Sequence, residues 1–246
     1  MLKNIIATTA LLAASAALAS AVTVTFNSDN TVADATNYAA QGASAGTYTV
    51  ATGTLTGGES VTVTLTESAG YIYALDASSI SLDANTNATA ALSALGISTS
   101  GLDYGIQGGQ GQNVLTVSIS GLTSGTTYTL VAIIGDNAAD DSDGTTYTLT
   151  AGTLVSSTYY DMTDEDGEGV ALEVATLTVD DDNAVLIVSE VTADEDGTIT
   201  YTLSSKGTLF LTAIASVPEP SAFGMLAGVG ALALVAARRR RSRKAA

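Results

Sequence analysis

The side chains of this chain that could carry chemistry are carboxylates, and they occur in short clusters. The clusters lie at residues 136–144, 161–168, 180–182 and 194–197. Calcium takes about six to eight oxygen ligands, which loops of this composition supply. Asp164, Asp166 and Glu173 stand at positions 3, 5 and 12 of a loop of the EF-hand type, with Gly167 at position 6. These three carboxylates are the candidate metal ligands, and calcium is the one cofactor that the sequence suggests.

A second interpretation of the same residues stays open. Position 1 of the loop is Met162, which does not supply the oxygen that calcium needs. Asp-Gly pairs at 143–144, 166–167 and 196–197 are typical of tight hairpin turns, because glycine adopts positive φ angles without strain. Under this interpretation the acidic clusters are solvated turns between strands.

Other catalytic chemistry is limited by the residue types that the chain lacks. It contains no histidine, cysteine or tryptophan. Most zinc sites, serine–histidine–aspartate triads and thiol nucleophiles need the first two. Pairs of carboxylates can hydrolyse glycosides, but carbohydrate-active sites generally also use aromatic platforms. The sequence therefore predicts a protein without enzymatic activity.

Charge is distributed unevenly along the chain. Residues 22–216 contain 24 acidic residues and a single basic one, Lys206, for a net charge of −23. So anionic a surface repels nucleic acids and anionic lipids. Nucleic acids are therefore not expected as partners.

The N-terminal residues have the three parts of a secretory signal peptide. Lys3 supplies the positive start, residues 5–18 are apolar, and Ala19-Ser20-Ala21 has the small residues of a cleavage site. We expect cleavage after Ala21, with cleavage after Ala19 as the alternative. The signal peptide, residues 1–21, implies passage through Sec-type export machinery.

The C-terminal segment, residues 217–246, also has three parts. Val217-Pro218-Glu219-Pro220 contains both prolines of the chain. Residues 222–237 are uncharged and would span about 24 Å as a helix, so we predict a transmembrane helix. A basic cluster follows, which places the C-terminus in the cytoplasm by the positive-inside rule. It consists of Arg238, Arg239, Arg240, Arg241, Arg243 and Lys244.

This tail resembles the PEP-CTERM sorting signal of bacterial exported proteins. The resemblance rests on Pro218-Glu219-Pro220, the helix rich in alanine and glycine, and the terminal arginines. It implies that an exosortase-type transpeptidase cuts near the motif and passes the body to the cell surface or matrix. It also implies an association with exopolysaccharide.

The body, residues 22–216, has the pattern of an all-β protein. Alternating runs rich in threonine and valine, such as 61–66 and 114–120, predict short strands separated by glycine-rich turns. Together they predict a sandwich of antiparallel strands, in one packed unit or two, with a division near residues 136–144. Residues 88–95 are the one helix expected within the body.

Two local patterns refine this prediction. The phrase Thr-Tyr-Thr-Leu recurs at 127–130 and 146–149, and we expect Tyr and Leu on one strand face and Thr on the other. Residues 119–131 resemble the E-to-F corner of fibronectin type III-like sandwiches. The resemblance implies that the Tyr128 hydroxyl bonds back to the backbone, as a structural group rather than a ligand contact.

The sequence therefore predicts a non-catalytic exported protein of the cell surface or extracellular matrix. The membrane would hold it by its C-terminal helix until processing. The alternative is an adhesion module that binds a glycan or a protein, with calcium assisting.

Overall fold

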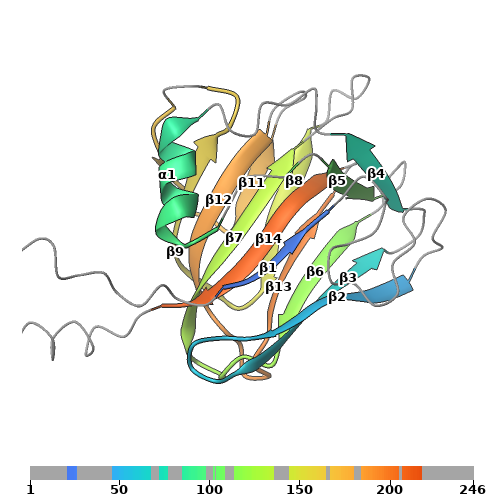
Figure 1. Ribbon diagram of the computed structural model, residues 1–246, viewed down its shortest axis with the longest axis vertical. Helices are drawn as coiled ribbons and strands as arrows, with labels where there is room; N and C mark the ends of the chain where they lie inside the picture. Colours follow the sequence, from blue (N-terminus) through green and yellow to red (C-terminus); the bar gives the residue numbers. More distant parts are fainter. Residues whose placement is uncertain are drawn as a thin grey trace, which may run out of the picture. The chain divides into compact units, whose positions relative to one another are not determined.

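The computed structural model describes residues 21–26, 46–67, 72–76, 85–97, 102, 104–108, 114–135, 144–164, 167–179, 184–204 and 207–217 of the 246-residue chain. Over these residues the chain forms two antiparallel β-sheets and one short helix (Figure 1). The predicted all-β class and sandwich of antiparallel strands are thus confirmed.

The first sheet, sheet A, has β14 near its centre. Its strands follow the order β10, β9, β12, β7, β14, β5, β4, and β1 pairs with β14 beside β5. The bounds are β1 Ala21–Thr25, β4 Ile72–Asp76, β5 Tyr104–Gly108, β7 Thr127–Gly135, β9 Thr153–Asp161, β10 Val170–Ala171, β12 Ala184–Thr192 and β14 Thr208–Ser216.

The second sheet, sheet B, follows the order β11, β8, β13, β6, β3, β2. Its strands are β2 Gly46–Thr54, β3 Ser60–Glu67, β6 Leu115–Ser120, β8 Thr145–Ala151, β11 Thr176–Val179 and β13 Ile199–Leu203. Every pairing in both sheets is antiparallel.

The body is one sandwich rather than two. Strands from both sides of residues 136–144 pair within each sheet: β7 with β12 and β14 in sheet A, and β6 with β13 in sheet B. A division of the body at these residues would separate paired strands, so they connect β7 to β8 within one unit.

The main core lies between the sheets and follows from the alternation in the sequence. Val61, Val63 and Leu65 of β3 point inward and are at most 1% exposed, while the threonines between them point outward. In β8 and β13, Tyr147 and Tyr201 are buried with their rings 5.1 Å apart, and threonines occupy the opposite face. This confirms the prediction that Tyr and Leu lie on one strand face and Thr on the other, and the face with Tyr and Leu is the inward one.

A second core covers the outer face of sheet A. The helix α1, Thr86–Ala94, packs Ala88 and Leu92 against that face, where they meet Ile133, Leu186 and Phe210. Figure 1 shows α1 beside β9 and β12. Because of this cover, β14 is buried on both faces, which matches its almost unbroken apolar sequence.

Asn85 fixes the start of α1. Its Oδ1 accepts a hydrogen bond of 2.8 Å from the Ala88 N–H, which satisfies a free donor of the first turn. Its Nδ2 donates to the carbonyl oxygens of Asp161, at 2.7 Å, and Gly167, at 3.0 Å. The side chain is fully buried, so it ties the helix to the connection between β9 and β10.

The predicted terminal helices are not among these elements. Within the described ranges, no helix is long and apolar enough to cross a membrane. Residues 1–20 and 218–246, which carry the predicted signal helix and transmembrane helix, lie outside the described residues. The chain divides into two units at Val217, directly after β14.

We predict that Asn85→Ala destabilises the fold. The change removes a helix cap, worth about 1 kcal/mol, and leaves the Asp161 carbonyl oxygen without its amide donor, at about 1–3 kcal/mol. Urea unfolding followed by circular dichroism measures the loss. Asn87→Ala is the matched control, because the exposed Asn87 makes one bond of 3.2 Å to the same Gly167 oxygen. Equal losses in the two variants would contradict the role of Asn85.

Candidate functional site

The two chain ends of the sandwich lie on neighbouring strands. Ala21, at the start of β1, pairs with Ala215, one residue before the end of β14. Val217 is described and half-buried, whereas the other sorting residues, Pro218, Glu219 and Pro220, lie outside the described residues, as do Ala19 and the basic cluster. The signal-peptide junction and the sorting-motif junction therefore leave the body from the same end of sheet A.

The three candidate calcium ligands are not brought together by the described residues. Asp164 is exposed just after β9, and Glu173 is exposed just after β10, while Asp166 lies outside the described residues. The Leu172 N–H donates to the Ser157 carbonyl, which continues the β9–β10 pairing. This register places Glu173 about five residues, or about 16 Å, along β9 from Asp161.

A second acidic cluster, at 194–197, forms the turn between β12 and β13. Oδ1 of Asp194 accepts hydrogen bonds from the backbone N–H groups of Asp196, at 3.1 Å, and Thr198, at 2.8 Å. Gly197 has a φ of 68°, which only glycine adopts without strain. Here the carboxylate shapes its own turn, as the second interpretation of these clusters expects. Among the described residues, no three acidic groups are close enough to hold a metal ion.

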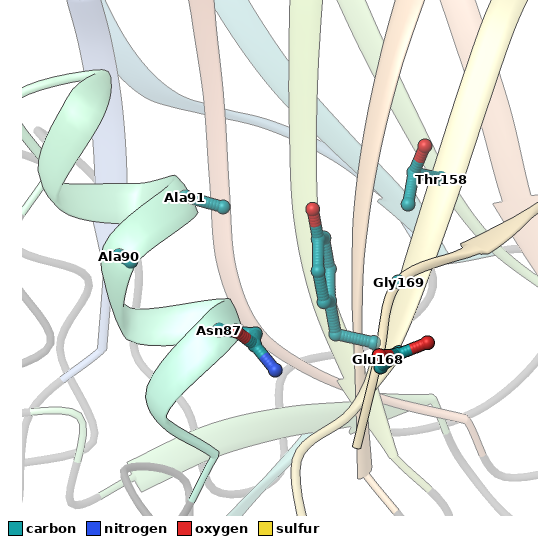
Figure 2. A pocket seen from close by; sticks show the side chains of 7 residues that line it. Asn87, Ala90, Ala91, Thr158, Glu168 and Gly169 are labelled. Atoms are coloured by element: carbon teal, nitrogen blue, oxygen red, sulfur yellow. The ribbon is translucent and has the colours of Figure 1, made fainter. Parts of the chain in front are cut away.

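A groove lies between α1 and the β9–β10 hairpin. It has a volume of about 460 Å³ and is open to solvent. Its walls are Asn87, Ala90 and Ala91 of the helix and Thr158, Tyr160, Glu168 and Gly169 of the hairpin. Figure 2 shows Asn87 and Ala91 on the helix side of the gap and Thr158 and Glu168 on the strand side.

The groove offers an amide, a carboxylate, a hydroxyl and one phenol. Gly169 packs directly against Tyr160, since a Cβ at this position would come within 2.7 Å of the ring. These groups can hydrogen-bond a small polar ligand, but the groove is open rather than enclosed. Among the described residues that line it, Glu168 is the one carboxylate, so these residues supply no pair of acids. Nothing in the sequence pattern predicted that these residues would meet.

Tyr128 lies at the corner where the chain crosses from β6 to β7. The Thr123 backbone N–H donates to its hydroxyl oxygen at 2.8 Å, which confirms the predicted bond back to the backbone. The hydroxyl in turn donates to Oε1 of Glu59 at 2.6 Å, and the Thr123 hydroxyl donates to the same oxygen at 2.6 Å. Glu59, in the turn between β2 and β3, was not predicted from the sequence, because it is 69 residues away.

This cluster moves the pKa values of both ionisable members. Burial by itself raises the pKa of Glu59, but the hydrogen bonds from Thr123 and Tyr128 outweigh it and hold the pKa below its ordinary value of 4.5. Burial, followed by the hydrogen bond to Glu59, raises the pKa of Tyr128. The corner thus keeps Glu59 ionised and Tyr128 protonated at neutral pH.

These observations define a class of protein: a β-sandwich whose last described strand is followed directly by a sorting motif. Residues 216–241 match the model of the PEP-CTERM protein-sorting motif. The chain therefore carries the PEP-CTERM motif that its tail resembles, and the motif implies an exported protein sorted to the surface. The match begins at the last residue of β14.

Comparisons with known proteins add no assignment for the body. No curated protein matches the chain. One similar solved structure holds the CBM22-1-GH10 modules of endo-1,4-beta-D-xylanase 10B from Clostridium thermocellum, complexed with xylohexaose. It has 14% identity and a TM-score of 0.34, over 63% of this chain and 26% of that one. Another is the GH31 alpha-xylosidase of Xanthomonas citri, at 10% identity and a TM-score of 0.10, over 80% and 23%. These values are too low to carry an argument about the body.

We predict that the Glu59 contribution to stability depends on pH. Since the folded-state pKa is lowered, the stabilisation is present above the ordinary pKa of 4.5 and is lost as the pH falls through the folded value. Glu59→Gln should therefore be less stable than the wild type at pH 7 and approach it at pH 3. Urea unfolding at both pH values measures the difference, and a gap that stays constant would refute the prediction. Tyr128→Phe removes the phenol hydroxyl, so in that variant the contribution of Glu59 to stability should depend less on pH.

Calcium gives a second test. Because the β9–β10 register separates Glu173 from Asp164, we expect millimolar calcium and a chelator to leave the melting temperature unchanged. Thermal unfolding with calcium, with EDTA and with magnesium as a control measures this. A rise with calcium alone would show a calcium site and would overturn the expectation.

Proposed function

We propose that this chain is a non-catalytic structural protein of the cell surface or extracellular matrix. The observation that carries the proposal is the position of the PEP-CTERM match, which starts at Ser216, where the last strand ends. A cut near Pro218-Glu219-Pro220 would remove the C-terminal segment and leave every described strand in place. The released body would keep all of its described strands, because the last of them, β14, ends at Ser216.

The route follows from the two ends of the chain. Sec-type machinery would export the body, and the signal peptide would be removed after Ala21 or Ala19. The helix predicted at residues 222–237 would hold the body at the membrane, with the basic cluster in the cytoplasm, until an exosortase-type transpeptidase acts. In support, Ala21 pairs with Ala215, so the signal peptide and the C-terminal segment join the body at the same end of sheet A.

The chemistry of the body supports a structural role. With 24 acidic residues against one basic residue, copies of residues 22–216 repel one another and remain hydrated. The absence of histidine, cysteine and tryptophan from the chain removes the usual catalytic groups. An acidic sandwich of this kind suits a coat or spacer within an exopolysaccharide matrix.

The alternative function is an adhesion module that binds a glycan or a protein. One observation favours it: the outer face of sheet B is covered with hydroxyl groups and carries no charged side chain among its described outward positions. A protein can be both a matrix component and a glycan binder, so this alternative extends the first proposal.

We predict that Glu219→Ala blocks release of the body. The change removes the acidic residue between the two prolines of the motif, so the chain should stay in the membrane fraction at its unprocessed mass. Fractionation of cells of the native host, followed by intact-mass analysis, gives the result. Glu173→Ala, an exposed acidic residue outside the motif, is the matched control and should be released normally. Normal release of Glu219→Ala would contradict the proposal.

A further inference from the structure

The outer face of sheet B, called here the threonine face, is built almost wholly from hydroxyl side chains. Every outward position of β3, β6, β11 and β13 is Thr or Ser. The two remaining strands, β2 and β8, contribute the outward residues Thr47, Thr49, Thr52, Thr54, Thr146, Thr148 and Thr150. None of these residues carries a charge, although residues 22–216 have a net charge of −23.

The register aligns these side chains in rows across the strands. One row crosses all six strands of sheet B with a threonine on each. Neighbouring strands lie about 4.8 Å apart, so the row is about 24 Å long. Its members, in order, are Thr47, Thr66, Thr116, Thr202, Thr148 and Thr176.

Hydrogen bonds within the face hold some hydroxyl groups in fixed directions. Thr47 and Thr66 share a hydroxyl–hydroxyl bond of 2.9 Å at one end of the row. In the next row, the Thr200 hydroxyl donates to the Ser118 hydroxyl at 3.1 Å. Each hydroxyl has one donor and two acceptor positions, so one such bond leaves further capacity for a ligand. The β-branched side chains also have few rotamers to lose.

The distribution of charge around the threonine face indicates which kind of partner it can bind. Acidic turns lie beyond the strand ends, with Glu59 in the β2–β3 turn and Asp194, Glu195 and Asp196 in the β12–β13 turn. An anionic polymer would be repelled by the body as a whole, and a cationic polymer would bind the acidic turns instead. The uncharged face between these turns is complementary to an uncharged partner rich in hydroxyl groups.

We propose that the threonine face binds a neutral, extended polysaccharide chain lying across the strands. The strand spacing is comparable to the length of one pyranose unit, so successive sugars can meet successive threonines. Each threonine offers a hydroxyl group to the sugar hydroxyls and a methyl group to the apolar face of the ring. Many weak contacts along one chain add up, as in other multivalent binding. The inference rests on the proposed surface or matrix location, where such chains are encountered.

The central pair of the row provides the test. Thr116 and Thr202 are cross-strand neighbours, and Thr116→Val/Thr202→Val removes two hydroxyl groups while keeping side-chain shape and β-propensity. The full chain, purified in mild detergent, is sedimented with amorphous cellulose, and the bound fraction is measured against cellulose concentration. We expect saturable binding by the wild type and a loss of about tenfold in affinity in the variant, from two hydrogen bonds.

Two further variants serve as controls. Thr126→Val/Thr153→Val changes two exposed threonines outside sheet B and should bind like the wild type. Thr116→Ser/Thr202→Ser keeps the hydroxyl groups and should retain most of the affinity. The proposal is overturned if the wild type does not bind saturably, if the valine pair binds normally, or if both valine pairs lose affinity equally. A serine pair as weak as the valine pair would also overturn it.

The outcome is independent of sorting. Binding to cellulose is measured on purified protein, whereas the surface location is tested by release of Glu219→Ala from cells. If the Glu219→Ala variant is released normally and the wild type binds through the threonine face, only the proposed location is contradicted. If Glu219→Ala blocks release as proposed but the wild type does not bind cellulose, only the polysaccharide proposal is contradicted.

Discussion

β14 is buried on both of its faces, and much of the architecture follows from this constraint. It pairs with β7 along one edge and with β1 and β5 along the other, so its backbone groups are used within sheet A. Leu209 and Ile214 point into the main core, whereas Phe210 and Leu211 point the other way, because a bulge at Phe210 shifts the register. An apolar outer face must be covered, and Ala88 and Leu92 of α1, together with Ile97 and Leu102, belong to the core that covers it.

The same constraint links folding to export. The first strand, β1, pairs with the last one, β14; Val22, for example, pairs with Ile214. This pairing joins residues from the two ends of the body. Contacts of such long sequence separation form late, since loop closure is costly before other structure exists. On the proposed Sec-type route, sheet A would therefore be complete only when the chain as far as Ser216 has left the channel. The sorting motif follows directly in the sequence, so on that route the last strand and the motif would emerge one after the other.

The sequence predicted what depends on local patterns and missed what depends on distant partners. Alternation in β3 and the corner at Tyr128 were predictable, because each is encoded within about ten residues. The identical pentapeptides at 126–130 and 145–149 nonetheless belong to different sheets, β7 in sheet A and β8 in sheet B. The residues that follow decide this: β7 continues as Val-Ala-Ile-Ile, which suits a strand covered on both faces, and β8 does not. Asn85 and Glu59 were missed, because their partners lie some 70 to 80 residues away.

Threonine on the outside of sheet B has an ordinary explanation that accounts for part of the pattern. It is the polar residue with strong β-propensity, so a solvent-facing strand favours it. Solubility alone, however, would accept charged side chains equally well, and natural exposed strands use them to discourage association. This body has 24 acidic residues and places none of them among the described outward positions of the six strands. Propensity explains the threonines and, because Asp and Glu are themselves depleted in strands, part of the absence of charge. Contact with a neutral partner is the further cause that the surrounding acidic turns favour.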